Sequence, residues 1–190
     1  MILFLISLLI TIITHEFGHL IAAKLVKCKV EVFSIGFGKE LFSFIYKGTK
    51  YRLALFPLGG YNKLKDETCI SQDKYAFTNL RYRDKLIIVS AGCLINVIMG
   101  IICLYIGEKS NIYNLIYFGW ISLTLGITNM LPIPALDGSY PILVWLEKLY
   151  GKQKGYAIMG RICKWGFNIL MVVNILCIPF LIRMIMKGQL

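Results

Sequence analysis

Two histidines and a glutamate lie within five residues of each other, as His15-Glu16-Phe17-Gly18-His19. Residues four apart on a helix share a face, so the two imidazoles can hold one metal ion. Glu16, next to the first histidine, is placed to act as a general base on a water molecule at that ion. The chain has two histidines in all, and both are here. The pattern predicts a zinc site with His15 and His19 as ligands and Glu16 as the base.

The same segment could also be read as two helix-surface histidines beside a solvated glutamate. It lies, however, inside the apolar run from Ile2 to Val26, about 25 residues that are long enough to span a bilayer. Ionisable side chains are costly in such a run, and where they are found they mark functional sites. We therefore favour the metal site.

A third ligand is expected elsewhere in the chain, because a catalytic zinc ion usually has three protein ligands and one open position. No histidine remains, and the acids deep within apolar surroundings are Glu16 and Asp137. Asp137 follows the helix-breaking stretch Leu131-Pro132-Ile133-Pro134 and precedes Gly138. It is the candidate third ligand, and the alternative is that it caps the helix that follows.

The composition indicates a membrane protein. Of the 190 residues, 57% are hydrophobic and 16% are charged, whereas about a quarter of a soluble domain is charged. The apolar residues gather near 2–26, 86–106, 112–131 and 156–186. We expect a mainly α-helical membrane protein with about four transmembrane helices, and a broken helix over 131–150 that carries Asp137. Residues 1–190 are predicted to form a single membrane-embedded domain.

A polar segment, residues 27–85, separates the first two apolar runs. Its alternating stretches, such as 29–35 and 51–55, and its glycines predict short β-strands or hairpins in a cytoplasmic or interfacial loop. Gly59 and Gly60 have two readings that we leave open. They belong either to a strand edge that pairs with an unwound substrate or to an ordinary hairpin turn.

The basic residues give an orientation. The net charge is +11, and residues 27–85 hold twelve Lys and Arg while residues 147–164 hold five. Cytoplasmic loops of membrane proteins are enriched in such residues and contact anionic lipid headgroups, so we expect both loops in the cytoplasm and no nucleic-acid partner. Lys24 follows His19 by five residues, or roughly 8 Å along a helix. The predicted metal site therefore falls in the cytoplasmic half of the membrane.

Four segments, in order, resemble the site-2 protease family of intramembrane zinc metalloproteases, peptidase family M50, and in particular its compact bacterial branch with the sporulation proteases. They are His15-Glu16-Phe17-Gly18-His19, Pro57-Leu58-Gly59-Gly60-Tyr61, Ala91-Gly92-Cys93-Leu94-Ile95-Asn96 and the stretch from Asn129 to Gly138. The family usually has Pro where this chain has Cys93. That difference weakens the third match and touches no expected catalytic role.

The resemblance implies a zinc metalloendopeptidase that cleaves in or near the transmembrane segments of membrane-protein substrates. By position, His15, His19 and Asp137 would bind Zn²⁺, and Glu16 would be the base. Asn129 would orient substrate or stabilise the oxyanion, or else tie down the broken helix. Asn96 is expected to form a hydrogen bond across helices.

The expected partners are a membrane-protein substrate, a membrane regulatory protein and the lipid bilayer, with the chain in a bacterial cytoplasmic membrane and its active site toward the cytoplasm. Two other classes of function are weighed against the protease. A cation-conducting transporter would use Glu16, His19 and Asp137 as its pathway, yet the predicted spans are apolar outside these motifs. A non-catalytic adaptor would be expected to lack a ligand or the base, and all four residues are present.

Overall fold

The computed structural model describes residues 2–67, 71–134 and 136–186. The chain forms two compact units, residues 1–131 and 132–190, and each is described by itself. The prediction of a single domain over 1–190 stays a prediction.

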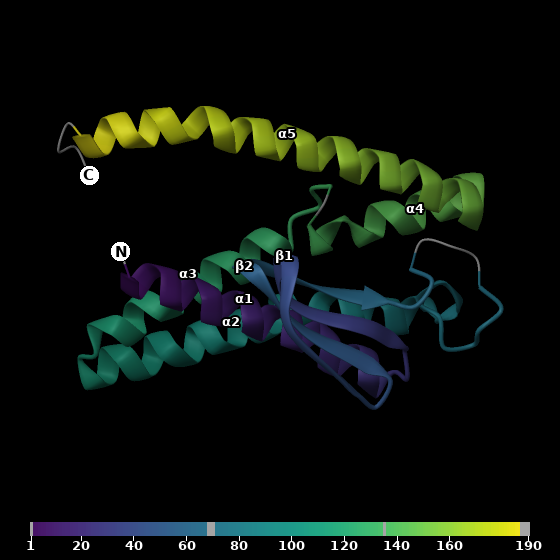
Figure 1. Ribbon diagram of the computed structural model, residues 1–190, viewed down its shortest axis with the longest axis horizontal. Coiled ribbons are helices and arrows are strands. Elements are labelled where there is room, and N and C mark those ends of the chain that lie inside the picture. Colours follow the sequence, from purple (N-terminus) through teal and green to yellow (C-terminus); the bar gives the residue numbers. More distant parts are fainter. Residues whose placement is uncertain (1, 68–70, 135, 187–190) are drawn as a thin grey trace. The chain divides into compact units, whose positions relative to one another are not determined.

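Three helices build the frame of the first unit: α1 (Ile2–Leu25), α2 (Tyr82–Ser110) and α3 (Tyr113–Asn129). Each of them packs against the other two (Figure 1). Small residues allow close approach, since a Cβ added at Gly18 of α1 would lie 2.9 Å from the Ala91 carbonyl oxygen of α2. Such contacts are typical of helix pairs in membranes.

Two of these helices, over residues 3–25 and 82–110, are long and apolar enough to cross a membrane. The helix α3 is shorter, with 17 residues. The prediction of a mainly helical fold with membrane-length helices and a small β region is confirmed. The number of spans, about four, stays a prediction.

The β region between α1 and α2 consists of two antiparallel strands, β1 (Val30–Tyr46) and β2 (Thr49–Leu64). Lys47 and Gly48, with φ of 48° and 76°, form the tight turn between them. The strands are longer than the short ones that we expected, with 17 and 16 residues, because irregularities bend them without ending the pairing. Residues 32–35 of β1 face both 50–53 and 60–63 of β2, which leaves 60–63 at an edge of the described sheet.

A short loop closes the first unit between β2 and α2. It contains the 3₁₀ turn η1 (Phe77–Asn79). Asp73 accepts hydrogen bonds from Lys65 and Lys29 at 2.8 and 3.2 Å. The Lys65 ammonium, with further help from the Tyr75 backbone and Lys29, holds the pKa of the Asp73 carboxyl well below its usual range. This exposed network ties the loop to the base of the sheet.

The second unit contains η2 (Asp137–Ser139), α4 (Tyr140–Tyr150) and α5 (Lys152–Met186). The helix α4 packs against α5, and a Cβ at Gly155 would lie 2.9 Å from the Glu147 backbone. Pro141 lies in the first turn of α4, where a proline is tolerated. The broken helix over 131–150 that carries Asp137 stays a prediction, and Ala135 lies outside the described residues.

Candidate functional site

The two histidines of α1 converge on one point. Both side chains are buried, and their Nε2 atoms lie 3.1 Å apart. Two nitrogen ligands of a tetrahedral zinc ion, each 2.0–2.1 Å from the metal, are about 3.3 Å apart. The pair therefore fits two ligands of one zinc ion.

Backbone and side-chain groups of α2 orient both imidazoles. Nδ1 of His19 lies 2.7 Å from the carbonyl oxygen of Ile88, to which it donates, and this directs Nε2 toward His15. Nδ1 of His15 lies 3.3 Å from the amide nitrogen of Asn96. The predicted hydrogen bond of Asn96 across helices is thus present. Metal-binding histidines typically have such a partner on the second ring nitrogen.

Asn96 also bears on whether the site suits a metal. It is fully buried, and within the described part of the chain its Oδ1 has no hydrogen-bond partner. Turning the amide over would place this acceptor against an Nδ1–H of His15. That hydrogen bond fixes the tautomer in which Nε2 of His15 carries the lone pair that a zinc ion needs.

Gly92 of α2 makes room for the histidine pair. A Cβ at this position would lie 2.8 Å from the carbonyl oxygen of His15 and would collide with the imidazole of His19. The sequence motif contained Gly92 but gave it no role. Its contribution is visible only once α1 and α2 are packed together.

Glu16 faces the edge of the sheet. Asn62 of β2 donates from its Nδ2 to the Glu16 carboxylate oxygen Oε2 at 2.9 Å and to the Glu16 main-chain oxygen at 2.8 Å. A Cβ on Gly60 would lie 2.7 Å from Cγ of Glu16. The edge that carries Gly59 and Gly60 therefore lies beside the predicted base. Asn62 was missed in the sequence, where nothing distinguishes it from other polar strand residues.

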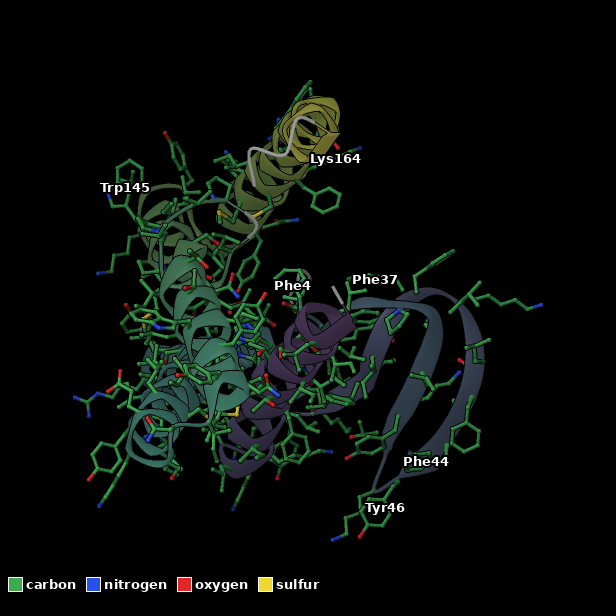
Figure 2. The ribbon with its side chains drawn as sticks, turned by 90° about the vertical axis from the view of Figure 1, so that its left-hand side faces the viewer. Phe4, Phe37, Phe44, Tyr46, Trp145 and Lys164 are labelled. Carbon is green, nitrogen blue, oxygen red and sulfur yellow. The ribbon has the colours of Figure 1, made fainter. Side chains whose placement is uncertain are left out.

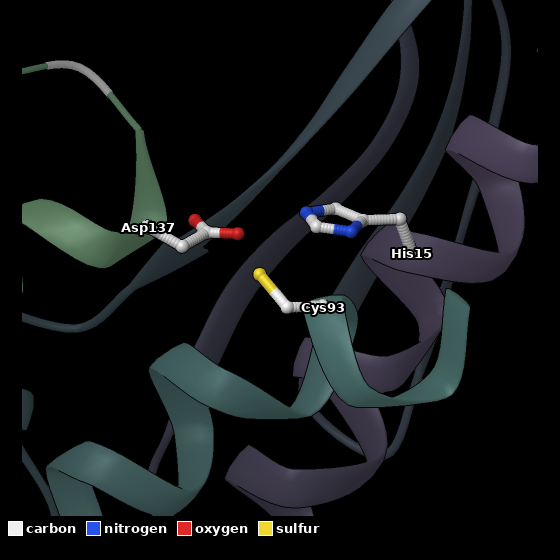
Figure 3. Close-up of side chains that lie close together, drawn as sticks. All are labelled: His15, Cys93 and Asp137. Carbon is white, nitrogen blue, oxygen red and sulfur yellow. The ribbon is translucent and has the colours of Figure 1, made fainter. Parts of the chain in front are cut away.

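Two further side chains of the first unit border the histidines. Nδ2 of Asn129, at the end of α3, lies 3.5 Å from Nε2 of His15. The buried thiol of Cys93 lies within 4.8 Å of a ring nitrogen of His15, and Figure 3 shows the two side chains projecting from α2 and α1. The sequence reading placed Asn129 near the site but assigned Cys93 no part in it.

Asp137 belongs to the second unit. It is the first residue of η2, and the cap positions of η2 and α4 are held by Leu136 and Ser139. Asp137 therefore does not occupy either cap position, which was the alternative to a ligand role. Its assignment as the third ligand stays a prediction.

Comparison with known proteins places this geometry in a family. A model of peptidase family M50 matches residues 3–112 and 108–173. The protein named "Putative zinc metalloprotease Cj1068" of Campylobacter jejuni is 46% identical over 90 residues, which are 45% of this chain and 24% of that protein. RC0203 of Rickettsia conorii, of the same description, is 41% identical over 107 residues, or 52% of this chain and 30% of its own length.

A third relative is named "Regulator of sigma-E protease RseP" in Salmonella typhimurium. It is 41% identical over 103 residues, which are 52% of this chain and 23% of the relative. The matched stretches thus span about a quarter to a third of these curated relatives, whereas the family model covers most of the present chain. The chain belongs to peptidase family M50, a family of membrane-embedded peptidases.

Proposed function

We propose that the chain is an intramembrane zinc metalloprotease that hydrolyses peptide bonds in or near the transmembrane segments of membrane proteins. The observation that carries this proposal is the 3.1 Å approach of the His15 and His19 Nε2 atoms on the same helix turn as Glu16. The two imidazoles supply two zinc ligands, and Asp137 supplies the third. The names of the relatives above, which describe zinc metalloproteases, support the choice of metal.

Different residues of this chain carry out different parts of the peptide hydrolysis. When bound, a zinc ion would supply Lewis acidity toward the scissile carbonyl and a water molecule. Glu16 takes a proton from a water molecule as the water oxygen attacks the carbonyl carbon, and then delivers the proton to the leaving amine. Asn129, 3.5 Å from Nε2 of His15, donates from its amide to the oxyanion.

The substrate binds as an extended segment along the edge of β2. A helix hides its carbonyl groups, so a transmembrane substrate must unwind before it can be cut. Residues 60–63 pair with 32–35 on one side, and the substrate would add a strand on the other. Gly59 and Gly60 keep side chains out of this edge, next to Glu16.

The protein is proposed to span a bacterial cytoplasmic membrane about four times, with its active site open to the cytoplasm. The twelve Lys and Arg of residues 27–85 and the five of residues 147–164 support this orientation. The partners are then the bilayer, a membrane-protein substrate and a membrane regulatory protein.

A comparison of membrane proteomes tests this function. Membranes from cells that contain the wild-type protein are compared with membranes from cells that contain Glu16→Ala. We expect at least one membrane protein to be found as fragments ending near a transmembrane segment in the first, and at full length in the second. Identical proteomes in the two would contradict the proposal.

A further inference from the structure

One side chain of β2 is hydrogen-bonded to Glu16 in two places. The amide nitrogen of Asn62, half-buried on the strand, lies 2.9 Å from Oε2 and 2.8 Å from the main-chain oxygen of Glu16. Both acceptors lie on α1, 46 residues away in the sequence. One amide group thus joins the strand edge to both the backbone and the carboxylate of one residue.

We propose that Asn62 is a positioning residue for Glu16, holding its carboxylate in the orientation that proton transfer requires. This inference rests on the proposed function, in which Glu16 is the general base. It adds a residue of the sheet to a site that the sequence assigned to helices and to the broken segment around Asp137.

The alternation of the strand explains why these residues act together. Side chains two apart on a strand point to the same face, so Gly60 and Asn62 both face α1. Gly60 leaves space for Cγ of Glu16, and Asn62 anchors the end of the same side chain. The next side chain, Lys63, points to the other face, where it pairs with Glu31 at 2.9 Å.

The side-chain oxygen of Asn62 also supports a role of this residue in positioning Glu16. Within the described residues, Oδ1 of Asn62 is buried and has no hydrogen-bond partner. A buried acceptor in that state is unfavourable. The orientation of the amide is therefore explained by its two contacts with Glu16 rather than by a hydrogen-bond network that stabilises the strand.

The contact has a defined consequence for proton transfer. Asn62 holds one oxygen of the Glu16 carboxylate, and the attacking water passes its proton to this oriented carboxylate. The water O–H bond breaks as the O–H bond on Glu16 forms. That proton then moves to the amine nitrogen as the C–N bond of the substrate breaks. Holding the carboxylate in place removes its rotational freedom before the reaction, and misplacement by about 1 Å can cost a hundredfold in rate.

Kinetic analysis of Asn62 variants tests the proposal. The full chain is placed in liposomes with a reporter that has one transmembrane helix interrupted by helix-breaking residues. For Asn62→Ala we expect kcat to fall about tenfold to a hundredfold, with KM within twofold and zinc content unchanged. Asn62→Asp, which places a carboxylate beside Glu16, should lose more, and Asn62→Gln, which keeps the donor, should recover part of the loss. Asn79→Ala is the matched control, because the exposed Asn79 amide donates to main-chain oxygens that the structure places in its own loop, those of Ser71 and Asp73, and it should keep the wild-type kcat.

A second measurement does not depend on cleavage. Thermal unfolding of the chelator-treated protein is compared for wild type, Asn62→Ala, Glu16→Ala and the double variant. We expect Asn62→Ala to lower the midpoint of unfolding clearly in the wild-type background and much less in Glu16→Ala, because the partner carboxylate is then already gone.

The two measurements separate this proposal from the proposed function. An unchanged kcat in Asn62→Ala and Asn62→Asp, in a protein that needs Glu16 for cleavage, would overturn the positioning role alone. Cleavage that continues in Glu16→Gln would overturn the proposed function. If no variant, wild type included, cleaves the reporter, the unfolding cycle decides: equal losses of stability in both backgrounds would overturn the Asn62–Glu16 coupling.

Discussion

The two edges of the β sheet contrast sharply in how they are held. At the edge formed by residues 60–63, beside α1, Asn62 donates two hydrogen bonds to Glu16, while Phe33 of the neighbouring stretch packs against Phe17 of α1 with ring centroids 6.4 Å apart. At the opposite edge, residues 42–46, large side chains are exposed: Phe42, Phe44, Ile45 and Tyr46 have 51–76% of their surface accessible. Figure 2 shows Phe44 and Tyr46 at this edge, away from the helices of the first unit.

This difference shows where position matters within one sheet. The edge beside α1 is fixed by hydrogen bonds to α1 and by Gly60, where an added Cβ would meet Glu16, and it carries the contacts to that residue. The opposite edge is held mainly by its own ladder and by ring pairs such as Phe44–Tyr51 at 5.1 Å. In a membrane-embedded family, exposed aromatic side chains suit the bilayer interface. We therefore expect the edge beside α1 to tolerate substitution poorly and the opposite edge to tolerate it well.

The largest effect is expected for the histidine pair on α1, the helix beside which the edge 60–63 lies. His15→Ala and His19→Ala each remove one of two nitrogen ligands, so the purified protein should lose its zinc and its cleavage activity. Metal analysis by mass spectrometry measures the loss. Thr14→Val is the control, because the Thr14 hydroxyl donates to the Ile10 carbonyl of its own helix. Full zinc content in His15→Ala would contradict the assignment.

Gly92→Ala should have the next largest effect. The added methyl group would meet the His15 carbonyl oxygen at 2.8 Å and the His19 ring, so we expect weaker zinc binding and a loss of about 1–3 kcal/mol in the free energy of unfolding. Gly160→Ala is the control, since a Cβ there meets nothing within 4 Å and alanine is the better helix former. If both variants lose zinc at the same chelator concentration, the close packing of Gly92 against the histidines does not contribute to zinc binding.

A direct comparison of the two sheet edges uses Gly60→Ala and Phe44→Ser. Gly60→Ala would meet Cγ of Glu16 at 2.7 Å and the Ser34 carbonyl oxygen at 2.9 Å, so we expect kcat to fall about tenfold or more. Phe44→Ser, at an exposed position, should change the free energy of unfolding by about 0.5 kcal/mol or less. Thermal unfolding and cleavage assays on both variants measure these effects. A larger loss of stability and of kcat in Phe44→Ser than in Gly60→Ala would contradict the contrast between the two edges.

The smallest effect concerns Cys28, just after α1. Burial, and secondarily the charge of Glu67, raises the pKa of its thiol to about 12, against about 8.5 in an unfolded chain. The thiol is therefore neutral in the folded protein and adds no pH dependence to stability near neutral pH. Stability should fall as the pH rises from about 8.5 toward 12, because the unfolded state releases the proton first. Labelling by a maleimide at pH 7.5 should be slower at Cys28 than at Cys163, and equal rates would contradict the burial.

Part of this arrangement could be read from the sequence. The apolar run at 2–26 predicted α1 almost residue by residue, and the four-residue spacing of His15 and His19 predicted their common face. Both are local properties, set by the rise and turn of a helix. The alternation in 29–35 and 51–55 likewise predicted strands but not their full length, because the bends that keep β1 and β2 paired depend on long-range contacts.

The missed residues share a physical reason. Asn62 is 46 positions from Glu16, and Gly92 is 73 positions from His19, so no periodicity connects them. Their importance arises only from how the sheet edge and α2 pack on α1. Cys93 was given no catalytic role in the sequence, where it only weakened the match to the family motif, although the structure places its thiol beside His15.

The central claim, that Glu16 is the base of a zinc protease, is tested most directly by measuring zinc and cleavage on the same preparation of Glu16→Gln. The substitution keeps the shape of the side chain and removes its ability to take a proton. We predict zinc content equal to that of the wild type and no cleavage of a membrane substrate that the wild type cuts. Cleavage by Glu16→Gln at the wild-type rate would contradict the account.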